Sequence, residues 1–237
     1  MKKTAKKSKV KLIITVAVIA VAIAGAAAMT VYLIGKNEKP PVEQSQGMSE
    51  FESVVLEEGL ELSNVSVASG AYPEDGSGAD VEKVVCATFK NTKNVTLQYA
   101  KLKVSIGDRT FDFEFSTIPA GESVLVFEKN KATADKLSGD VAVSPEYIVF
   151  FNEEPTLLEN DIEITVENGE IKVKNISGVD IDREISVFFK NKMEDKYLGG
   201  ITYRVRIPAV KAGETVGTYS SHASKDATEI MFCQYGA

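Results

Sequence analysis

Three blocks of sequence occur twice in the same order, and this internal repeat constrains the fold more than any other feature. The matched blocks are FKNTKNVTL (89–97) with VKNISGVDI (173–181), FDFEFSTIPAGESV (111–124) with YRVRIPAVKAGETV (203–216), and YIVFFN (147–152) with EIMFCQ (229–234). Similar blocks in one order indicate two copies of a single structural unit. We therefore predict two tandem domains, at 62–155 and 158–237.

Within each copy, bulky residues alternate with polar ones, a period that places one set of side chains on one face of a strand. The alternating positions are Phe111, Phe113 and Phe115 in the first copy, and Ile201, Tyr203, Val205 and Ile207 in the second. Asn168-Gly169 suits a tight hairpin turn, and Gly107-Asp108 occupies a similar place in the first copy. Short strands at this spacing predict an all-β fold of two tandem immunoglobulin-like β-sandwich domains.

An uncharged apolar run of 24 residues at 12–35 follows six lysines in residues 1–11. A helix of that length exceeds the roughly 30 Å hydrocarbon core of a bilayer. Because the lysines precede the run, the N-terminus should remain in the cytoplasm. We predict a cytoplasmic basic segment at 1–11, a single transmembrane helix at 12–35, and a cell-membrane protein whose C-terminal domains are extracytoplasmic.

A cleaved signal peptide is the alternative interpretation of this run, with Ala26 and Ala28 supplying an A-x-A site before Met29. Both interpretations place the domains outside the cytoplasm. Residues 36–61 are polar at first and contain prolines, which predicts a stalk or linker. Its last part, FESVVLEEGL at 51–60, has the near-helical spacing of a short helix.

The charge of the chain is unevenly distributed. Its formal net charge is -7, and the seven lysines among residues 1–36 contribute +7, so residues 37–237 carry -14. Such an acidic part repels phosphate backbones, which argues against nucleic-acid binding. The sequence contains no phosphate loop, dinucleotide fingerprint or H-E-x-x-H motif, so we expect no cofactor, and no small-molecule substrate is evident.

The second copy resembles the FxLYD-type and related immunoglobulin-like modules of bacterial surface proteins. The resemblance rests on IKVKNISGVDI (171–181), ISVFFKN (185–191) and IPAVKAGETV (207–216), with Val187, Phe188 and Phe189 near the place of the family's Phe-x-Leu-Tyr-Asp string. KYLGGITYRVRIPAVKAGET (196–215) is also similar to uncharacterised extracytoplasmic proteins of clostridium-like bacteria. The resemblance implies a non-catalytic surface module and no site residues.

Two cysteines and one histidine are candidates for chemistry. Cys86 and Cys233 would lie outside the cytoplasm, where disulfides persist. They are not equivalent in the repeat, so the alternatives are two free thiols, one interdomain disulfide or an intermolecular bond. His222 lies among Ser220, Ser221 and Asp226, but a triad needs partners from distant segments, so we interpret this as a serine-rich loop.

Acidic clusters are weak candidates for calcium, which prefers six to eight oxygen ligands. The first cluster is Glu74, Asp75, Asp80 and Glu82 in a glycine-containing loop, and the second is Asp180, Asp182 and Glu184, which we expect on an exposed strand face. Asn64, Asn94 and Asn175 begin N-x-S/T sequons, and we interpret them as turn residues. Asn91 and Asn175 occupy matched positions in the repeat, where each should bond its own backbone at a turn.

These observations favour a non-enzymatic binding or assembly module that meets a protein or another cell-envelope partner. The alternative is an enzyme acting on envelope polymers, which would need paired carboxylates in a pocket at the domain junction.

Overall fold

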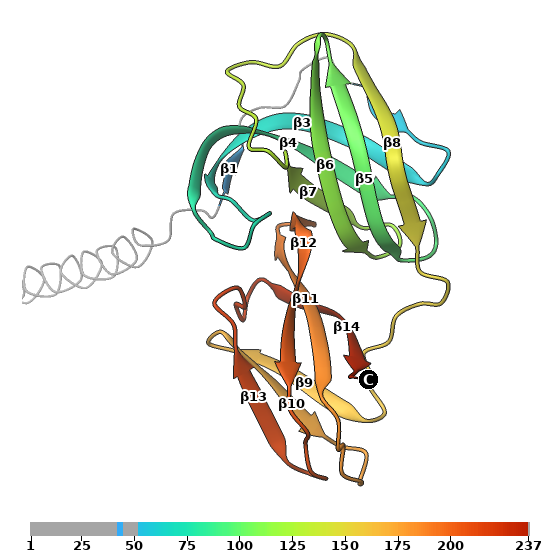
Figure 1. Cartoon of the computed structure of the whole chain (residues 1–237), viewed down its shortest axis with the longest axis vertical. Coiled ribbons are helices and arrows are strands. Elements are labelled where there is room, and N and C mark those ends of the chain that lie inside the picture. Colours follow the sequence, from blue (N-terminus) through green and yellow to red (C-terminus); the bar gives the residue numbers. More distant parts are fainter. Residues whose placement is uncertain (1–41, 45–51, 237) are drawn as a thin grey trace, which may run out of the picture. The chain divides into compact units, whose positions relative to one another are not determined.

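A computed structural model describes residues 42–44 and 52–236 of the 237-residue chain. Its described part is all-β (Figure 1). The predicted segments at 1–11 and 12–35 lie outside the described residues. Within the described residues, no helix is long and apolar enough to cross a membrane. The strands are β1 (Val42–Gln44), β2 (Val54–Val55), β3 (Leu60–Ala71), β4 (Asp80–Asn91), β5 (Leu97–Ile106), β6 (Arg109–Ile118), β7 (Ser123–Phe127), β8 (Val141–Phe150), β9 (Ile162–Glu167), β10 (Glu170–Asn175), β11 (Ile185–Met193), β12 (Lys196–Ile207), β13 (Thr215–Tyr219) and β14 (Thr228–Tyr235).

The strands pair in the same order twice. In the first half, β3 to β8, the pairing orders are β3-β4-β7 and β6-β5-β8. In the second half, β9 to β14, they are β9-β10-β13 and β12-β11-β14. All of these pairs are antiparallel, and β7 joins β12 in parallel, so that a single eight-stranded sheet contains strands of both halves (Figure 1).

Alternating side chains of these strands form two hydrophobic cores. In the first, Phe89 stacks on Phe115 with ring centroids 4.7 Å apart and meets Phe113 edge to face. The second gathers Val173, Val187 and Ile207 with their neighbours. Each side chain of this size stabilises the fold by about 1.5–3 kcal/mol when fully buried. Because alternate side chains of a strand lie on one face, the period-two pattern of the sequence accounts for both cores.

The predicted hairpin turn between β9 and β10 is confirmed. Asn168 and Gly169 both have positive φ, 50° and 81°, as a two-residue turn of the I′ type requires. Glu167 and Glu170 pair directly on either side of it.

The matched asparagines occupy matched structural positions. Asn91 is fully buried, and its side-chain amide donates to the carbonyls of Val95 and Ile118 at 2.8 and 2.9 Å. Its Oδ1 accepts from the amide of Lys93, which closes the expected turn on its own backbone.

Asn175 repeats this arrangement in the second half. Its amide donates to the carbonyls of Val179 and Val210 at 2.7 and 2.9 Å, and its Oδ1 accepts from the amide of Ser177. Each asparagine thereby ties the end of one strand, β4 or β10, to the turn that precedes β7 or β13.

The region expected to be a linker, 36–61, is strand in part. Val54 and Val55 pair with β3, so the short helix expected there is wrong for the described residues. A turn closed by Leu56 N to Leu60 O (2.8 Å) and Gly59 N to Leu56 O (3.0 Å) reverses the chain into β3. Leu56 packs against the first core, and this burial explains why the segment is held in the sheet.

Candidate functional site

The β11–β12 hairpin carries the junction between the two halves. Tyr197 and Leu198 at the start of β12 pair with Val124 and Leu125 of β7. The Tyr197 side chain is fully buried in the first core, and its hydroxyl donates to Glu229 Oε1 at 2.8 Å. A residue of the second half therefore completes the core of the first.

A large bulge in β12 lies just beyond this contact. Phe189 pairs with Tyr203 and Asn191 with Leu198, so Lys190 of β11 faces four residues, 199–202, instead of one. Backbone groups in such a bulge lose their partners in the ladder and need others. The fully buried Lys190 supplies them, because its Nζ donates to the carbonyls of Gly200 and Ile201 at 3.1 and 2.7 Å.

The same ammonium group reaches the first half. Its third hydrogen bond goes to the carbonyl of Ser116 in β6, at 3.2 Å. Beside it, the hydroxyls of Ser116 and Thr202 lie 2.9 Å apart. Three carbonyl acceptors match the three protons of a charged lysine.

Glu74 satisfies the amide side of the bulge. It belongs to the loop at 72–79 between β3 and β4, and its Oε2 accepts from Gly200 N at 2.7 Å while Oε1 accepts from Phe127 N at 2.8 Å. One carboxylate thus bridges the end of β7 and the bulge of β12. We call Glu74, Ser116, Lys190 and Gly200 the junction cluster.

Burial shifts the pKa values of both charged groups in the junction cluster. Part of the Glu74 residue reaches the surface, but its carboxylate is shielded from water, which raises its pKa to about 7 against the lowering effect of its amide donors and of Lys190. Burial likewise lowers the pKa of Lys190 to about 7, against the raising effect of Glu74.

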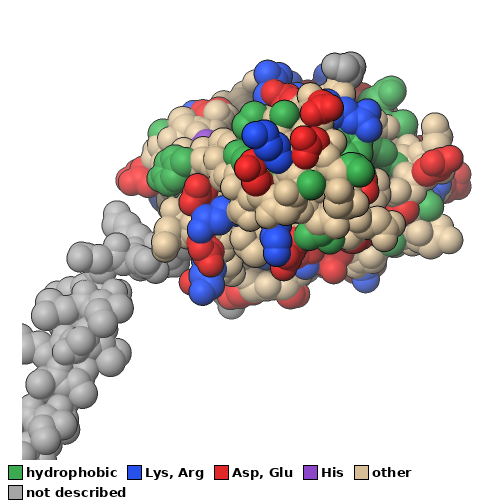
Figure 2. Space-filling view, turned by 90° about the horizontal axis from the view of Figure 1, so that it is seen from below, with side chains coloured by type: hydrophobic (Ala, Val, Ile, Leu, Met, Phe, Trp, Pro, Cys, Tyr) green, Lys and Arg blue, Asp and Glu red, His purple; other side chains and the backbone are tan. Residues whose placement is uncertain are grey.

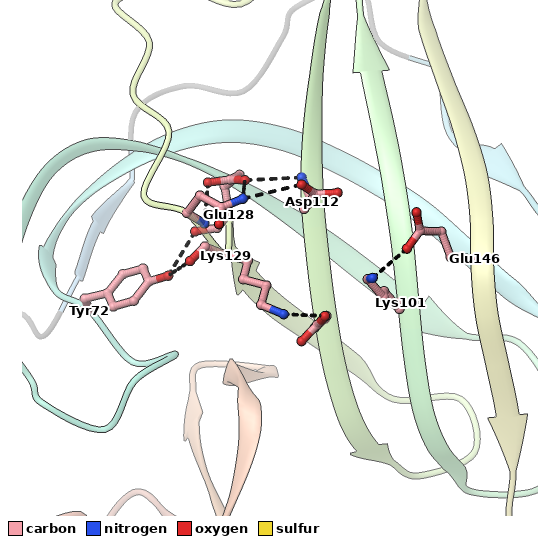
Figure 3. Close-up of polar contacts among 8 residues, drawn as sticks. Tyr72, Lys101, Asp112, Glu128, Lys129 and Glu146 are labelled. Atoms are coloured by element: carbon pink, nitrogen blue, oxygen red, sulfur yellow. Dashed lines mark hydrogen bonds and ion pairs between the residues drawn. The ribbon is translucent and has the colours of Figure 1, made fainter.

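Aromatic residues surround the loop at 72–79. Tyr203 stacks on His222 with centroids 4.4 Å apart, and its hydroxyl donates to the Pro73 carbonyl at 3.4 Å. Figure 3 shows Tyr72 donating to the carbonyls of Glu128 and Lys129, each at 3.0 Å. The start of the loop is therefore fastened both to the segment after β7 and to β12.

The calcium candidates are not gathered into one site. Glu74 faces the junction cluster, whereas Asp75 accepts from Ser77 and pairs with Lys131 at 2.9 Å. Asp80 and Glu82 are exposed at the start of β4. Among the described residues, no group of three or more His, Cys, Asp or Glu side chains is arranged to hold a metal ion.

The second acidic cluster does not lie on a strand face, so this prediction is wrong. Residues 180–184 precede β11, with only an isolated bridge between Ile181 and Val210. Asp180 accepts from Ala212 N at 2.9 Å, and Glu184 pairs with Arg206 at 3.5 Å. Hydrogen bonds to the neighbouring loop therefore replace the expected strand pairing.

The remaining candidates have structural partners. His222 stacks on Tyr203, and its backbone amide donates to Ser220 Oγ at 3.3 Å, a contact within the loop and not a catalytic relay. Of the sequon asparagines, Asn94 lies at a turn and Asn175 ends a strand, whereas Asn64 lies inside β3 beside a register shift, so the expectation of a turn is wrong there.

Both cysteines are buried free thiols in the structure. Cys86 Sγ lies 3.1 Å from Ser66 Oγ, and Cys233 belongs to the second core. Burial raises the pKa of Cys86 to about 11 and that of Cys233 to about 12. Both thiols are therefore protonated and shielded near neutral pH.

We expect both thiols of the folded chain to resist alkylation at pH 8 and to react together on unfolding. The measurement is intact mass after iodoacetamide treatment without reductant, in buffer and in guanidinium chloride. Two added groups in denaturant and none in buffer are expected. No added group in denaturant would show instead that the thiols are joined in a disulfide.

Exposed apolar side chains are scattered over the described surface. The large ones are Val55, Tyr147, Ile176, Val179 and Tyr219. Figure 2 shows one face on which acidic and basic side chains are interspersed.

Comparisons of this chain with protein-family models, curated proteins and solved structures find no match.

Proposed function

We propose that the chain is a membrane-anchored, extracytoplasmic binding or assembly module of the bacterial cell envelope. The observation that carries this proposal is that the charged groups of the junction cluster are engaged in hydrogen bonds to the backbone. All three protons of Lys190 go to backbone carbonyls, and both oxygens of Glu74 accept backbone amides. The enzyme alternative needs a pair of carboxylates at the junction between the halves. The junction cluster contains one carboxylate, that of Glu74, and this group already joins β7 to β12.

The proposed module consists of two immunoglobulin-like domains. In such sandwiches, strands A, B and E share one sheet, while C pairs with F and, in variable-type domains, with C′. The orders β3-β4-β7 and β6-β5-β8 correspond to A-B-E and C′-C-F, and the second half repeats both. This supports a pair of related domains and the resemblance to FxLYD-type surface modules.

The proposed location rests on the sequence of residues 1–36. The six lysines before the apolar run at 12–35 favour a cytoplasmic N-terminus, with residues 36–61 leading to the domains. A cleaved signal peptide would leave the same domains outside the cytoplasm without the anchor.

Photo-crosslinking in living cells tests the binding function. A photoreactive amino acid replaces Tyr147 or Val179, which are 55% and 65% exposed and belong to different halves. We expect at least one position to give a reproducible adduct with a single protein or envelope polymer after irradiation, and none without it. Irradiated cells that yield no reproducible adduct from either position would contradict the proposal.

A further inference from the structure

The outer edge of β9 corresponds to an edge that is already occupied in the first half. Leu60 of β3 pairs with Asn91, and Ile162 of β9 pairs with the equivalent Asn175. On the side away from β4, β3 is joined by β1 and β2. Among the described strands, β9 pairs with β10 alone, and we call its other side the open edge of β9.

Two residues further along, Leu62 of β3 corresponds to Ile164 of β9, and the two differ in their surroundings. Val54 of β2 pairs with Leu62 and packs against the first core, and Leu62 is fully buried. Ile164 packs against the second core in the same way, but it and Val166 are only half-buried. An added strand beside β9 would cover the remaining apolar surface, as β2 does beside β3.

The open edge of β9 also presents backbone hydrogen-bonding groups. A two-residue turn is closed by a hydrogen bond between the residues that flank it, here Glu167 and Glu170. Bonded and non-bonded pairs alternate along an antiparallel ladder, so every second residue counted back from Glu167 bonds to β10. The amides and carbonyls of Ile164 and Val166 therefore point away from β10, towards the open edge.

Other edges of the described sheets have features that protect them, and β9 does not. β8 contains Pro145, which pairs with Leu102 beside a register shift. Thr156 accepts a hydrogen bond from Cys233 N at 2.8 Å and so covers part of β14. Proline, bulges and covering segments hinder pairing with another chain. The sequence of β9, IEITVE, contains no proline, glycine or lysine, and its pairing with β10 has no register shift.

The outward side chains of β9 indicate the charge of a matching strand. Glu163, Thr165 and Glu167 are exposed and alternate with the core residues. Two antiparallel copies of β9 centred on Ile164 would place Glu167 opposite Asp161, and a shift by two residues would place Glu163 opposite Glu167. Like charges directly opposite each other destabilise a strand pair, whereas opposite charges stabilise it. A basic strand is therefore favoured over a second copy of β9.

We propose that the open edge of β9 binds an extended segment of another protein as an added antiparallel strand. Its apolar side chains would face the second core, and its basic side chains would lie beside Glu163 and Glu167. In such pairing, main-chain hydrogen bonds supply affinity and alternate side chains supply specificity. This inference rests on the proposed binding function and names the surface and the partner chemistry for it.

Titration of the purified full-length chain with a synthetic strand tests this inference. The probe is a capped peptide in which every second residue is valine and the others are lysine and threonine. Its matched control has glutamate in place of lysine. We expect the lysine peptide to bind about tenfold more tightly than the glutamate peptide.

Hydrogen exchange followed by NMR locates the bound peptide. The lysine peptide should slow exchange of the Ile164 and Val166 amides. The amides of Thr215 and Gly217 belong to β13, at the opposite edge of the same sheet, and are the internal reference. Their exchange rates should not change.

Two pairs of variants separate the edge from its charge. Val166→Pro removes an amide from the open edge and should abolish binding, whereas Val166→Ala retains the amide and should still bind. Glu163→Lys should remove the preference for the lysine peptide. Glu153→Lys makes the same change at an exposed position outside β9 and should keep the preference. Should Val166→Pro fail to fold, the Glu163→Lys pair decides.

Three results would overturn the inference. They are no binding or equal binding of the two peptides, slowed exchange at Thr215 and Gly217 in place of Ile164 and Val166, and protection that grows with chain concentration without peptide. The last would show that a second copy occupies the edge. A reproducible adduct from Tyr147 in cells, without peptide binding at β9, would support the proposed function and still reject this surface.

Discussion

Replacing Gly200 by alanine is expected to lower the free energy of unfolding by about 3 kcal/mol. A Cβ at this position would overlap the backbone carbonyl of Glu114 and lie 2.9 Å from Glu74 Oε2. The carbonyl belongs to β6 and cannot move like a flexible side chain, so the bulge must shift and its bonds to Glu74 and Lys190 must lengthen. Denaturant unfolding followed by circular dichroism measures the change.

Gly217→Ala is the matched control, because Gly217 also lies in a strand and lacks a positive φ. The three atoms nearest to the added methyl group all belong to the side chain of Glu170, which can rotate away. Its effect should stay within about 1 kcal/mol. If Gly200→Ala proves as mild as Gly217→Ala, then the bulge is not the rigid junction described above.

Asn91→Ala and Asn175→Ala should each lower the free energy of unfolding by a similar amount, roughly 3 kcal/mol. Each change removes an amide that serves two or more carbonyls from a fully buried site, and each carbonyl left without a partner costs about 1–3 kcal/mol. Thermal and denaturant unfolding of the two variants give the comparison.

Asn91→Asp and Asn94→Ala serve as controls for this pair. Asn91→Asp keeps the acceptor for Lys93 but loses both donors, so it should be nearly as damaging as Asn91→Ala. Asn94 is exposed near the same turn, and its replacement should cost less than about 0.5 kcal/mol. A large loss from one asparagine and none from its counterpart would contradict the structural equivalence of the two positions.

Local features of the fold were predictable from the sequence because they depend on nearby residues. The Asn168-Gly169 turn follows from two residues that tolerate positive φ, and the alternation around Phe113 marks the face that is buried. The equivalence of Asn91 and Asn175 was visible in the repeat, although their distant acceptors, the carbonyls of Ile118 and Val210, were not.

The junction cluster could not be predicted, because it depends on pairing between distant segments. Only two residue pairs join β7 to β12, too few to leave a pattern. Lys190 follows three apolar residues and resembles the polar end of a strand, yet it is fully buried. The available signal was Gly199-Gly200 within a strand, since glycine there often marks a bulge or a close backbone approach.

Glu74 was noticed for a different chemistry. Its acidic neighbours suggested a calcium loop, but Asp75, Asp80 and Glu82 point to other partners or to solvent. Burial and two backbone amides make Glu74 a structural carboxylate, and this difference depends on the position of β12, which the local sequence does not encode.

The central claim is that the two halves are held together as one unit by the β7–β12 pairing, Tyr197 and the junction cluster. Differential scanning calorimetry of the purified full-length chain tests it most directly. We predict one transition for the described strands, with equal calorimetric and van't Hoff enthalpies, because the core of the first half cannot be completed without the second. Two separate transitions in the wild-type chain would contradict this account.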